Sequence, residues 1–494
     1  MAVALLLPAG CSDGDGDGDE AAPADGGTTT SAVERPEGPA ADVAEVLEGG
    51  DGTILGSATS GRLPDDWVEE ERMAAGTAAS YRADGDLPED GRFELAEAGS
   101  AEYRTRIVVR RPERPEDFNG TVVVEWLNVS GGLDAAPDYS FMADELHRGG
   151  YAWVGVSAQH IGIEGGPVAV SVRGAGGMAG QGLKRLDPER YGDLSHPGDA
   201  FAYDIYTQVG RAVRAGEVVG DLEPERVLAV GESQSGFTLT TYADGVQPRA
   251  RVFDGIFIHS RGASAAPLGE AGRGIDVAAT FIGGSPTRIR DDLDVPVLVL
   301  ETETDVLTIV NYHRARQDDT DRFRLWEVAG TAHADRSLVG PLADSLDCGG
   351  PINDGPQRFV VRAGLRALDR WVRDGDAPPE AERLEVDATP AFVRDQDGIV
   401  VGGVRTPHVD SPVAALSGEA RGPGGTVCLL LGSTTPLPPE RLAERYGSAD
   451  AYLDAYTEAT DAAVEAGFVL EDDREAVLED AEPDRIPEAT EAGR

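Results

Sequence analysis

The sequence predicts an α/β protein with a mostly parallel central sheet and a C-terminal extension. Two short apolar runs that contain β-branched residues, at 226–230 and 295–300, indicate this class together with a third strand candidate at 323–328. Such runs are typical of strands that are buried on both faces of a parallel sheet. Helical segments are expected beside them, such as 236–244 after the first run. A chain of 494 residues is long enough for one large domain of this class with insertions.

Further elements are predicted on both sides of these runs. Residues 43–110 contain short strand-like pieces separated by turns, which favours leading antiparallel strands. Runs 107–110 and 122–126 are expected to be adjacent strands joined by a Pro-rich turn. The other predicted strands are 151–157 and 252–259, and the predicted helices are 139–147, 200–216 and 355–374. The Gly-rich stretch 161–197 has no clear period, so it forms either part of a substrate entrance or a surface excursion.

The pattern changes after the proline pair at 378–379. We expect residues 43–378 to form the core and residues 379–494 to pack on it as an extension, not as an independent binding module. The predicted elements of the extension are short strands at 392–404 and 426–431 and a helix-rich acidic segment at 440–466.

Ser233 lies where the predicted strand 226–230 turns into a helix. The local sequence, GESQS, places a small residue two positions before and two positions after this serine. A serine on a sharp strand-to-helix corner needs small residues there, because a bulky side chain would collide with adjacent backbone. Ser235 fails this test, since Phe237 stands two positions after it. Ser233 is therefore the candidate nucleophile.

A carboxylate cluster and a histidine follow the next predicted strands. A serine hydroxyl needs a base to remove its proton, and neutral imidazole suits that task near pH 7. His333, in a Gly/Thr/Ala loop after run 323–328, is the candidate base. The acid that orients the imidazole must lie at a neighbouring strand end, where Asp305 and Glu303 have similar reach. Serine, acid and histidine thus each follow a predicted strand, in that order.

Several segments resemble the α/β-hydrolase superfamily: GESQSG at 231–236, PVLVLETETD at 296–305 and VAGTAHAD at 328–335. Four more resemble the poorly characterised bacterial α/β-hydrolase domain proteins, namely VVVEWLNVSGG, DPERYGDLSHPGDAFAYDI, DGIFIHSRG and CGGPINDGP. The resemblance covers roughly residues 50–481. It implies an α/β-hydrolase fold and a serine hydrolase with no settled substrate. It also implies that Asp305 is the triad acid, with Glu303 as the alternative.

Two backbone amides are candidates for stabilising the oxyanion of a tetrahedral intermediate. Such donors supply several kcal/mol of transition-state stabilisation. The N–H of Gln234 directly follows the nucleophile. The second donor is expected from the loop after run 121–127, where glycines permit close backbone approach. Val129 is the candidate in that loop, and a plain strand-to-helix turn is the alternative.

The charge and the motif content of the sequence limit the kinds of molecule that the protein is expected to bind. The formal net charge is −46, from 43 basic and 89 acidic residues. This charge argues against binding of nucleic acid or anionic membranes by the body of the protein. No zinc-protease motif, paired C-x-x-C, EF-hand or phosphate loop occurs in the sequence, so no metal or cofactor is expected. The alternating Asp and Gly residues at 13–19 favour an acidic tether over a weak calcium site.

These observations predict hydrolysis of a small-molecule carboxylic ester or related acyl compound through a Ser-His-Asp triad and an acyl-enzyme. An amidase or peptidase would use the same residues. A non-catalytic surface protein that uses the fold as a binding scaffold is the alternative of another class, and retention of all three triad residue types in order weighs against it.

The N-terminus predicts export. Residues 1–11 are apolar, end in small residues before Cys11, and are too short to span a bilayer. They resemble a bacterial lipoprotein signal, which implies acylation of Cys11; cleavage by another route or a cytosolic protein are the alternatives. Residues 12–42 have the composition of a flexible tether. Cys348 and Cys428 remain, and they either pair in an oxidising compartment or stay as buried thiols.

Overall fold

The structure is a computed structural model, which describes residues 35–56, 63–170, 177–276, 284–308, 310–422 and 425–487. The chain divides into two units, Met1–Arg35 and Pro36–Arg494, and the fold below belongs to the second. Cys11, the predicted signal segment 1–11 and most of the predicted tether lie outside the described residues.

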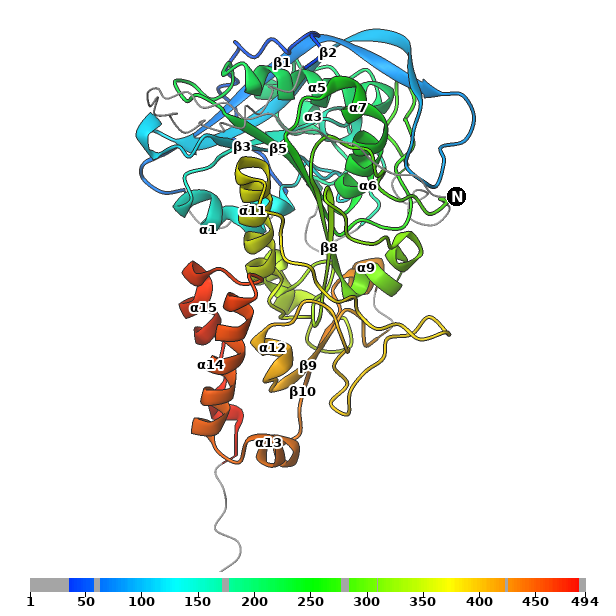
Figure 1. Ribbon diagram of the computed structural model, residues 1–494. Coiled ribbons are helices and arrows are strands. Elements are labelled where there is room, and N and C mark those ends of the chain that lie inside the picture. The colour runs from blue at the N-terminus through cyan, green and yellow to red at the C-terminus, as the bar shows by residue number, and fades with distance from the viewer. Residues whose placement is uncertain are drawn as a thin grey trace, which may run out of the picture. The chain divides into compact units, whose positions relative to one another are not determined.

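In the described part of the chain, eight strands form one sheet in the order β1-β2-β4-β3-β5-β6-β7-β8 (Figure 1). The first pairings, β1 with β2 and β2 with β4, are antiparallel, and the other pairings of this sheet are parallel. The strands are β1 (Trp67–Ala83), β2 (Leu95–Pro112), β3 (Thr121–Trp126), β4 (Ala152–Val156), β5 (Arg226–Glu232), β6 (Gly255–His259), β7 (Val297–Thr302) and β8 (Phe323–Val328). The predicted mostly parallel sheet is confirmed.

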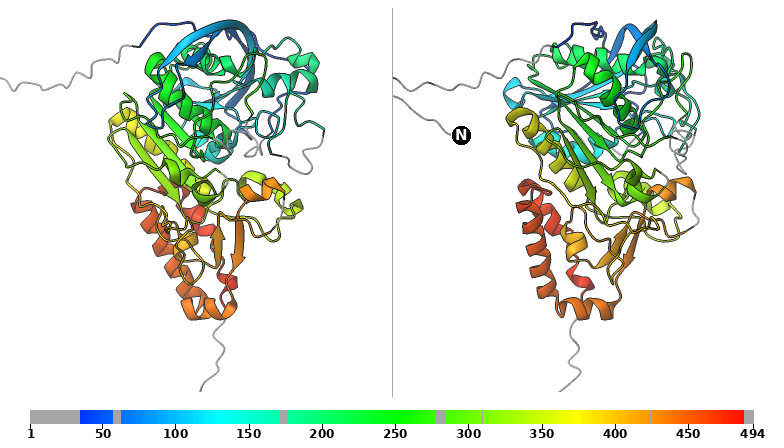
Figure 2. Two further views of the ribbon diagram at one scale, coloured as in Figure 1. Left: turned by 90° about the vertical axis from the view of Figure 1, so that its right-hand side faces the viewer. Right: turned by 45° about the vertical axis from the view of Figure 1, so that its right-hand side comes forward.

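Helices cover both faces of the sheet (Figure 2). One face packs against α5 (Ala202–Arg214) and α6 (Gln234–Thr241), and the other against α1 (Pro137–Arg148) and α11 (Gln357–Asp374). Alternate residues of one strand therefore enter different cores: Val122 and Val124 of β3 face the α5 side, and Val123 faces α11. This double burial explains why apolar residues predominate in the central strands.

Shorter helices occupy the connections. The Gly-rich stretch predicted as irregular contains α2 (His160–Glu164), α3 (Leu183–Leu186) and α4 (Pro188–Tyr191). The others on the body are α7 (Gln247–Ala250), α9 (Glu303–Leu307) and α10 (Arg336–Val339). None of the helices in the described ranges is both long and apolar enough to cross a bilayer.

The prediction that runs 107–110 and 122–126 are neighbouring strands is wrong. Strand β4 lies between β2 and β3, since Ile107 pairs with Val156 and Val122 pairs with Ala152. The chain leaves β3, passes through α1 and returns as β4, parallel to β3 and next to it. That crossover occupies the edge of β3 on which β2 would otherwise pair, and proximity of consecutive strands is only a tendency.

The folded part also begins earlier than the predicted boundary at residue 42. Ala41 is buried and its N–H donates to the carbonyl of Gln208 at 3.0 Å, while Asp42 pairs with Ala75 of β1. The last residues of the predicted tether thus pair with the edge strand. Edge pairing is made by backbone groups, so a composition poor in large apolar residues does not reveal it.

The C-terminal extension packs on α11. Its helices are α12 (Pro407–Asp410), α13 (Pro439–Tyr446), α14 (Ala449–Glu465) and α15 (Arg474–Glu479), and its strands β9 (Ala414–Ser417) and β10 (Ser433–Pro436) pair with each other. Figure 1 shows α14 and α15 side by side beyond the end of α11. Tyr452 and Tyr456 of α14 share a buried cluster with Phe359 of α11.

Neither strand predicted in the extension forms as expected. Thr426–Leu430 is a 3-10 helix (η6), because Cys428 and Leu431 are buried while Leu429 is 40% exposed. Burial every third residue suits a 3-10 turn and not the two-residue alternation of a strand. Residues 392–404 make isolated bridges, including Arg394 with Val400, because turns interrupt the segment.

Candidate active site

Ser233 occupies the corner between β5 and α6. Its φ of 60° and ψ of −121° are an unfavourable conformation for a residue with a side chain. Its N–H donates to the His259 carbonyl of β6 at 2.9 Å, which fixes the corner against the sheet. A Cβ added to Gly231 would lie 2.9 Å from Leu239 and 3.0 Å from Ser235 Cβ. The small residues around this serine therefore have the steric reason that the sequence suggests.

The side chains of Ser233, His333 and Asp305 meet at the C-terminal edge of the parallel strands. Ser233 Oγ lies 2.7 Å from His333 Nε2, and His333 Nδ1 lies 2.6 Å from Asp305 Oδ1. All three residues are buried. A carboxylate that accepts from Nδ1–H leaves Nε2 free to accept the serine proton. The structure thus brings together the three residues chosen from the sequence.

Asp305 is held by the start of a helix that directly follows a strand. Strand β7 continues to Thr302, which caps α9, and Asp305 lies in the first turn. The N–H and hydroxyl of Thr302 donate to Asp305 Oδ2 at 2.8 and 2.6 Å, which leaves Oδ1 for His333. Burial raises the pKa of the Asp305 carboxyl, but the charge and hydrogen bond of His333 and the two hydrogen bonds from Thr302 together outweigh it. The pKa therefore lies below its ordinary value.

Glu303, the alternative acid, binds the backbone of the loop that carries His333. Its Oε1 accepts from the N–H of Gly330 at 2.7 Å, and its Oε2 accepts from the N–H of Gly418 and from Arg394, each at 3.1 Å. Gly330 precedes His333 by three residues, and Gly418 follows β9. Glu303 therefore ties the histidine loop to the extension, and the structure does not bring it to the imidazole.

Glu232 is a second carboxylate at the imidazole, and sequence reasoning missed it. Its Oε1 lies 3.4 Å from His333 Nε2, the nitrogen that also faces Ser233. Burial raises the pKa of Glu232 to about 7. The signal was available, because the residue before the nucleophile lies on the same tight corner.

The two carboxylates affect the base. Burial lowers the pKa of His333, but Asp305 and then Glu232 raise it further than burial lowers it, and the resulting pKa is about 9. An imidazole must be neutral to accept a proton, so His333 with this pKa is suited to act as a base at alkaline pH.

The loop after β3 contacts the corner that carries Ser233. The Asn128 amide donates to the Glu232 carbonyl at 3.1 Å, and its oxygen accepts from the N–H of Ser130 at 2.8 Å. The N–H of Val129 makes a long contact of 3.4 Å with Gln234 Oε1. Val129 and Gln234, the two residues chosen as oxyanion donors, therefore lie next to each other beside Ser233.

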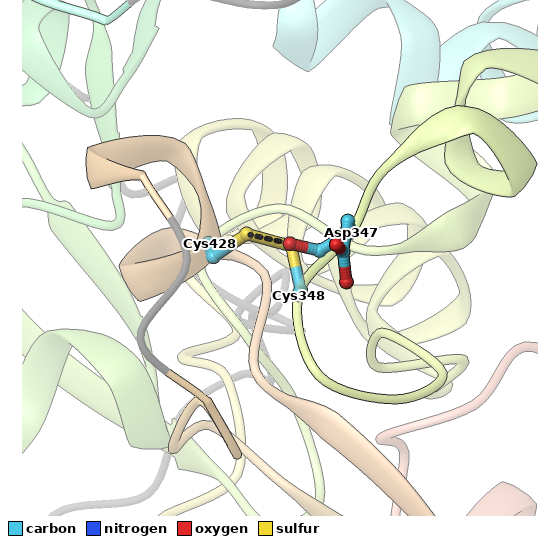
Figure 3. Close-up of a disulfide and its surroundings, with 3 residues drawn as sticks. All are labelled: Asp347, Cys348 and Cys428. Atoms are coloured by element: carbon cyan, nitrogen blue, oxygen red, sulfur yellow. Dashed lines mark hydrogen bonds between the residues drawn. A yellow bond between two sulfur atoms is a disulfide. The ribbon is translucent and has the colours of Figure 1, made fainter.

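A disulfide supports the histidine loop from the other side. Cys348 and Cys428 are bonded, with a Cα–Cα distance of 5.4 Å, and Cys428 Sγ lies 3.7 Å from the carbonyl oxygen of Asp347 (Figure 3). The segment that contains Cys428 also accepts, through the Leu430 carbonyl, from the N–H of Ala334 at 3.0 Å. Because Ala334 follows His333, the disulfide fastens the extension beside the imidazole.

Part of the Gly-rich stretch 161–197, for which the sequence left an entrance and a surface excursion as alternatives, lines a cavity of about 920 Å³. Ile161 and residues 165–167 form part of its wall, and residues 265–270 and 273–276 form most of the rest. The triad residues are not among the described residues that line it. Within the described ranges, no group of three or more His, Cys, Asp or Glu side chains is arranged to hold a metal ion.

Comparison with known proteins identifies the family. The model of the alpha/beta hydrolase domain family matches residues 35–479, and the chain belongs to this family. No curated protein matches the chain significantly.

Several solved structures are similar to this chain at low sequence identity. An esterase from the fungus Rhizomucor miehei is 12% identical, with 64% of this chain and 86% of that chain covered and a TM-score of 0.33. A serine hydrolase from Xanthomonas campestris, described as having no lid, is 14% identical, with 60% and 94% covered and a TM-score of 0.29. A glucuronoyl esterase from Solibacter usitatus is 10% identical, with 60% and 82% covered and a TM-score of 0.29.

Proposed function

We propose that this protein is a serine hydrolase that cleaves carboxylic esters or related acyl compounds through Ser233, His333 and Asp305. One observation carries the proposal: the unbroken contact from Asp305 through the imidazole to the hydroxyl of a serine held at φ 60°. A nucleophile, a base within hydrogen-bond reach and an orienting acid are the arrangement that acyl transfer needs.

The reaction would proceed in two halves. Ser233 Oγ attacks the acyl carbon while its proton passes to His333 Nε2, and the tetrahedral intermediate collapses when the leaving alcohol takes that proton. Water then gives a proton to the same nitrogen and attacks the acyl-enzyme, so that the acid is released and the Ser233 hydroxyl is restored. Asp305 stays ionised throughout, because its role is to hold Nδ1–H and stabilise the imidazolium.

The N–H groups of Gln234 and Val129 are the proposed oxyanion donors. The positions of these two residues support the proposal. Gln234 directly follows the nucleophile, and Val129 lies on the loop that contacts the corner at Ser233. The Gln234 side chain would have to release the Val129 N–H before that N–H could turn to an oxyanion.

A fluorophosphonate probe tests the proposal. Such a probe phosphonylates a serine that is activated by a base, so we expect the folded protein to be labelled, heat-denatured protein to stay unlabelled, and the adduct to lie on the tryptic peptide that contains Ser233. No labelling of the folded protein would favour a binding scaffold. Labelling followed by turnover of amides but not esters would favour an amidase or peptidase.

We further propose that the protein is exported and anchored by acylation of Cys11. The apolar segment 1–11 supports this, as does the Cys348–Cys428 disulfide, because such bonds persist mainly in oxidising compartments. Mass spectrometry of the mature protein from membranes should find Cys11 as an acylated N-terminal residue. An intact, unmodified residue 1 in the mature protein would contradict both parts.

A further inference from the structure

His333 is faced by carboxylates on both ring nitrogens. Asp305 contacts Nδ1 at 2.6 Å, as a triad acid does, and Glu232 lies 3.4 Å from Nε2. Nε2 is the nitrogen that must receive the serine proton and hand it on. The second carboxylate is therefore next to the moving proton, whereas the first is on the far side of the ring.

The position of Glu232 is fixed by the fold. It is the last residue of β5, and its backbone carbonyl and Oε2 both accept from the Asn128 amide, at 3.1 and 3.4 Å. The residue is buried, with 4% of its surface exposed. A buried carboxylate normally has an arginine or lysine partner, but the contacts described for Glu232 are this amide and the imidazole.

Besides His333, three ionisable side chains on neighbouring elements act on Glu232. His259 lies on β6, Asp138 on α1 and Asp305 on α9, and all three influence its carboxyl electrostatically. His259 is not a free cation in this position, because burial lowers its pKa to about 4. Its Nδ1 lies 2.8 Å from Asp138 Oδ1. Of these two imidazoles, His333 is thus the one suited to carry a charge during the reaction.

We propose that Glu232 is a positioning residue that stabilises protonated His333 through Nε2 and thereby sets the lowest pH at which the enzyme works. The inference rests on the proposed function. When Ser233 gives up its proton, the new Nε2–H has two acceptors within reach. They are the oxygen of the leaving alcohol and the carboxylate of Glu232. The carboxylate holds the imidazolium in place until the leaving group takes the proton.

The sign of the effect follows from charge. An ionised Glu232 favours the imidazolium and so raises the pKa of His333. Below that pKa the base is already protonated and cannot accept from Ser233. Glu232→Gln removes the charge with little change in shape, so the pKa of His333 falls and activity extends to lower pH. In the same variant the imidazolium formed in the transition state loses a partner, so the maximal rate at high pH falls.

Hydrolysis of p-nitrophenyl acetate as a function of pH tests the inference. In Glu232→Gln, we expect the acidic limb of kcat/KM to move down by about one pH unit, since a close charge shifts a pKa by roughly 1–3 units. Glu232→Asp keeps the charge at a greater distance, so its limb should lie between those of Glu232→Gln and the wild type. Glu303→Gln is the matched control: it removes another buried carboxylate, one that does not contact His333, and should leave the limb in place.

Direct NMR titration of the His333 imidazole separates this inference from the proposed function, because it requires no turnover. A lower pKa of His333 in Glu232→Gln than in the wild type supports the inference even if no ester is hydrolysed. Equal pKa values in the two proteins overturn it, whatever the activity. If Glu232→Gln does not fold, the same comparison is made with Glu232→Asp, where an unchanged pKa of His333 overturns the inference.

Discussion

Ser233→Ala is expected to lower kcat for ester hydrolysis by about a million-fold, since loss of the nucleophile in comparable triads has that effect. The variant has no hydroxyl to attack the acyl carbon, because the strained corner at residue 233 then carries only a methyl group. The fold should survive, because the Ser233 backbone N–H still donates to His259 and alanine is smaller than serine. Steady-state kinetics and thermal unfolding measure the two effects separately.

Ser235→Ala is the control for this substitution. Ser235 lies two residues further on, in α6, and its buried hydroxyl has no hydrogen-bond partner among the described residues. Its removal should leave kcat within a few-fold of the wild type. A Ser233→Ala variant that retained more than a small part of its activity would mean that another residue is the nucleophile.

Asp305→Asn is expected to lower kcat by about ten-thousand-fold through the wrong histidine tautomer. The N–H and hydroxyl of Thr302 donate to the outer oxygen of residue 305, so the asparagine carbonyl must take that place. Its NH₂ group then faces His333 Nδ1, which has to accept. The ring proton moves to Nε2, where it blocks transfer from Ser233. Shape is conserved, so KM should change far less than kcat.

Glu303→Gln separates the two carboxylates that the sequence left as alternatives. Glu303 contacts Gly330, Gly418 and Arg394 and not the imidazole, so its substitution should lower the free energy of unfolding while kcat stays within about ten-fold of the wild type. Loss of a buried charge-assisted hydrogen bond costs about 1.5–3 kcal/mol. The reverse result, with Glu303→Gln inactive and Asp305→Asn active, would exchange the roles.

The order of serine, acid and histidine could be predicted because each follows a parallel strand, and parallel strands end at one edge of a sheet. The choice between Asp305 and Glu303 could not be made from spacing alone. It depends on where β7 stops and α9 begins, and that point is set by the cap at Thr302. A shift of two residues at such a boundary is within the ordinary uncertainty of sequence reasoning.

Contacts between segments that are far apart in the chain could also not be predicted from the sequence. Glu303 meets Gly418 across more than a hundred residues, and the extension reaches the histidine loop through Leu430. The short run that contains Cys428 was predicted as a strand because apolar composition does not distinguish a period of three from a period of two over five residues. The position of β4 between β2 and β3 was also not predicted. It depends on the side of β3 to which the crossover through α1 returns the chain, and the local sequence does not specify that side.

The bond between Cys348 and Cys428 has a consequence for how the protein can be divided. These residues are 80 positions apart, and the second belongs to the segment after the sheet and its covering helices are complete. A shortened version that stops at Asp374 would keep the eight-stranded sheet and its covering helices. It would lose Gly418 as a partner of Glu303, Leu430 as the partner of Ala334 and Cys428 as the partner of Cys348. The loop that carries the imidazole would then be free on one side. Engineering of a compact catalyst from this chain therefore has to trim elsewhere.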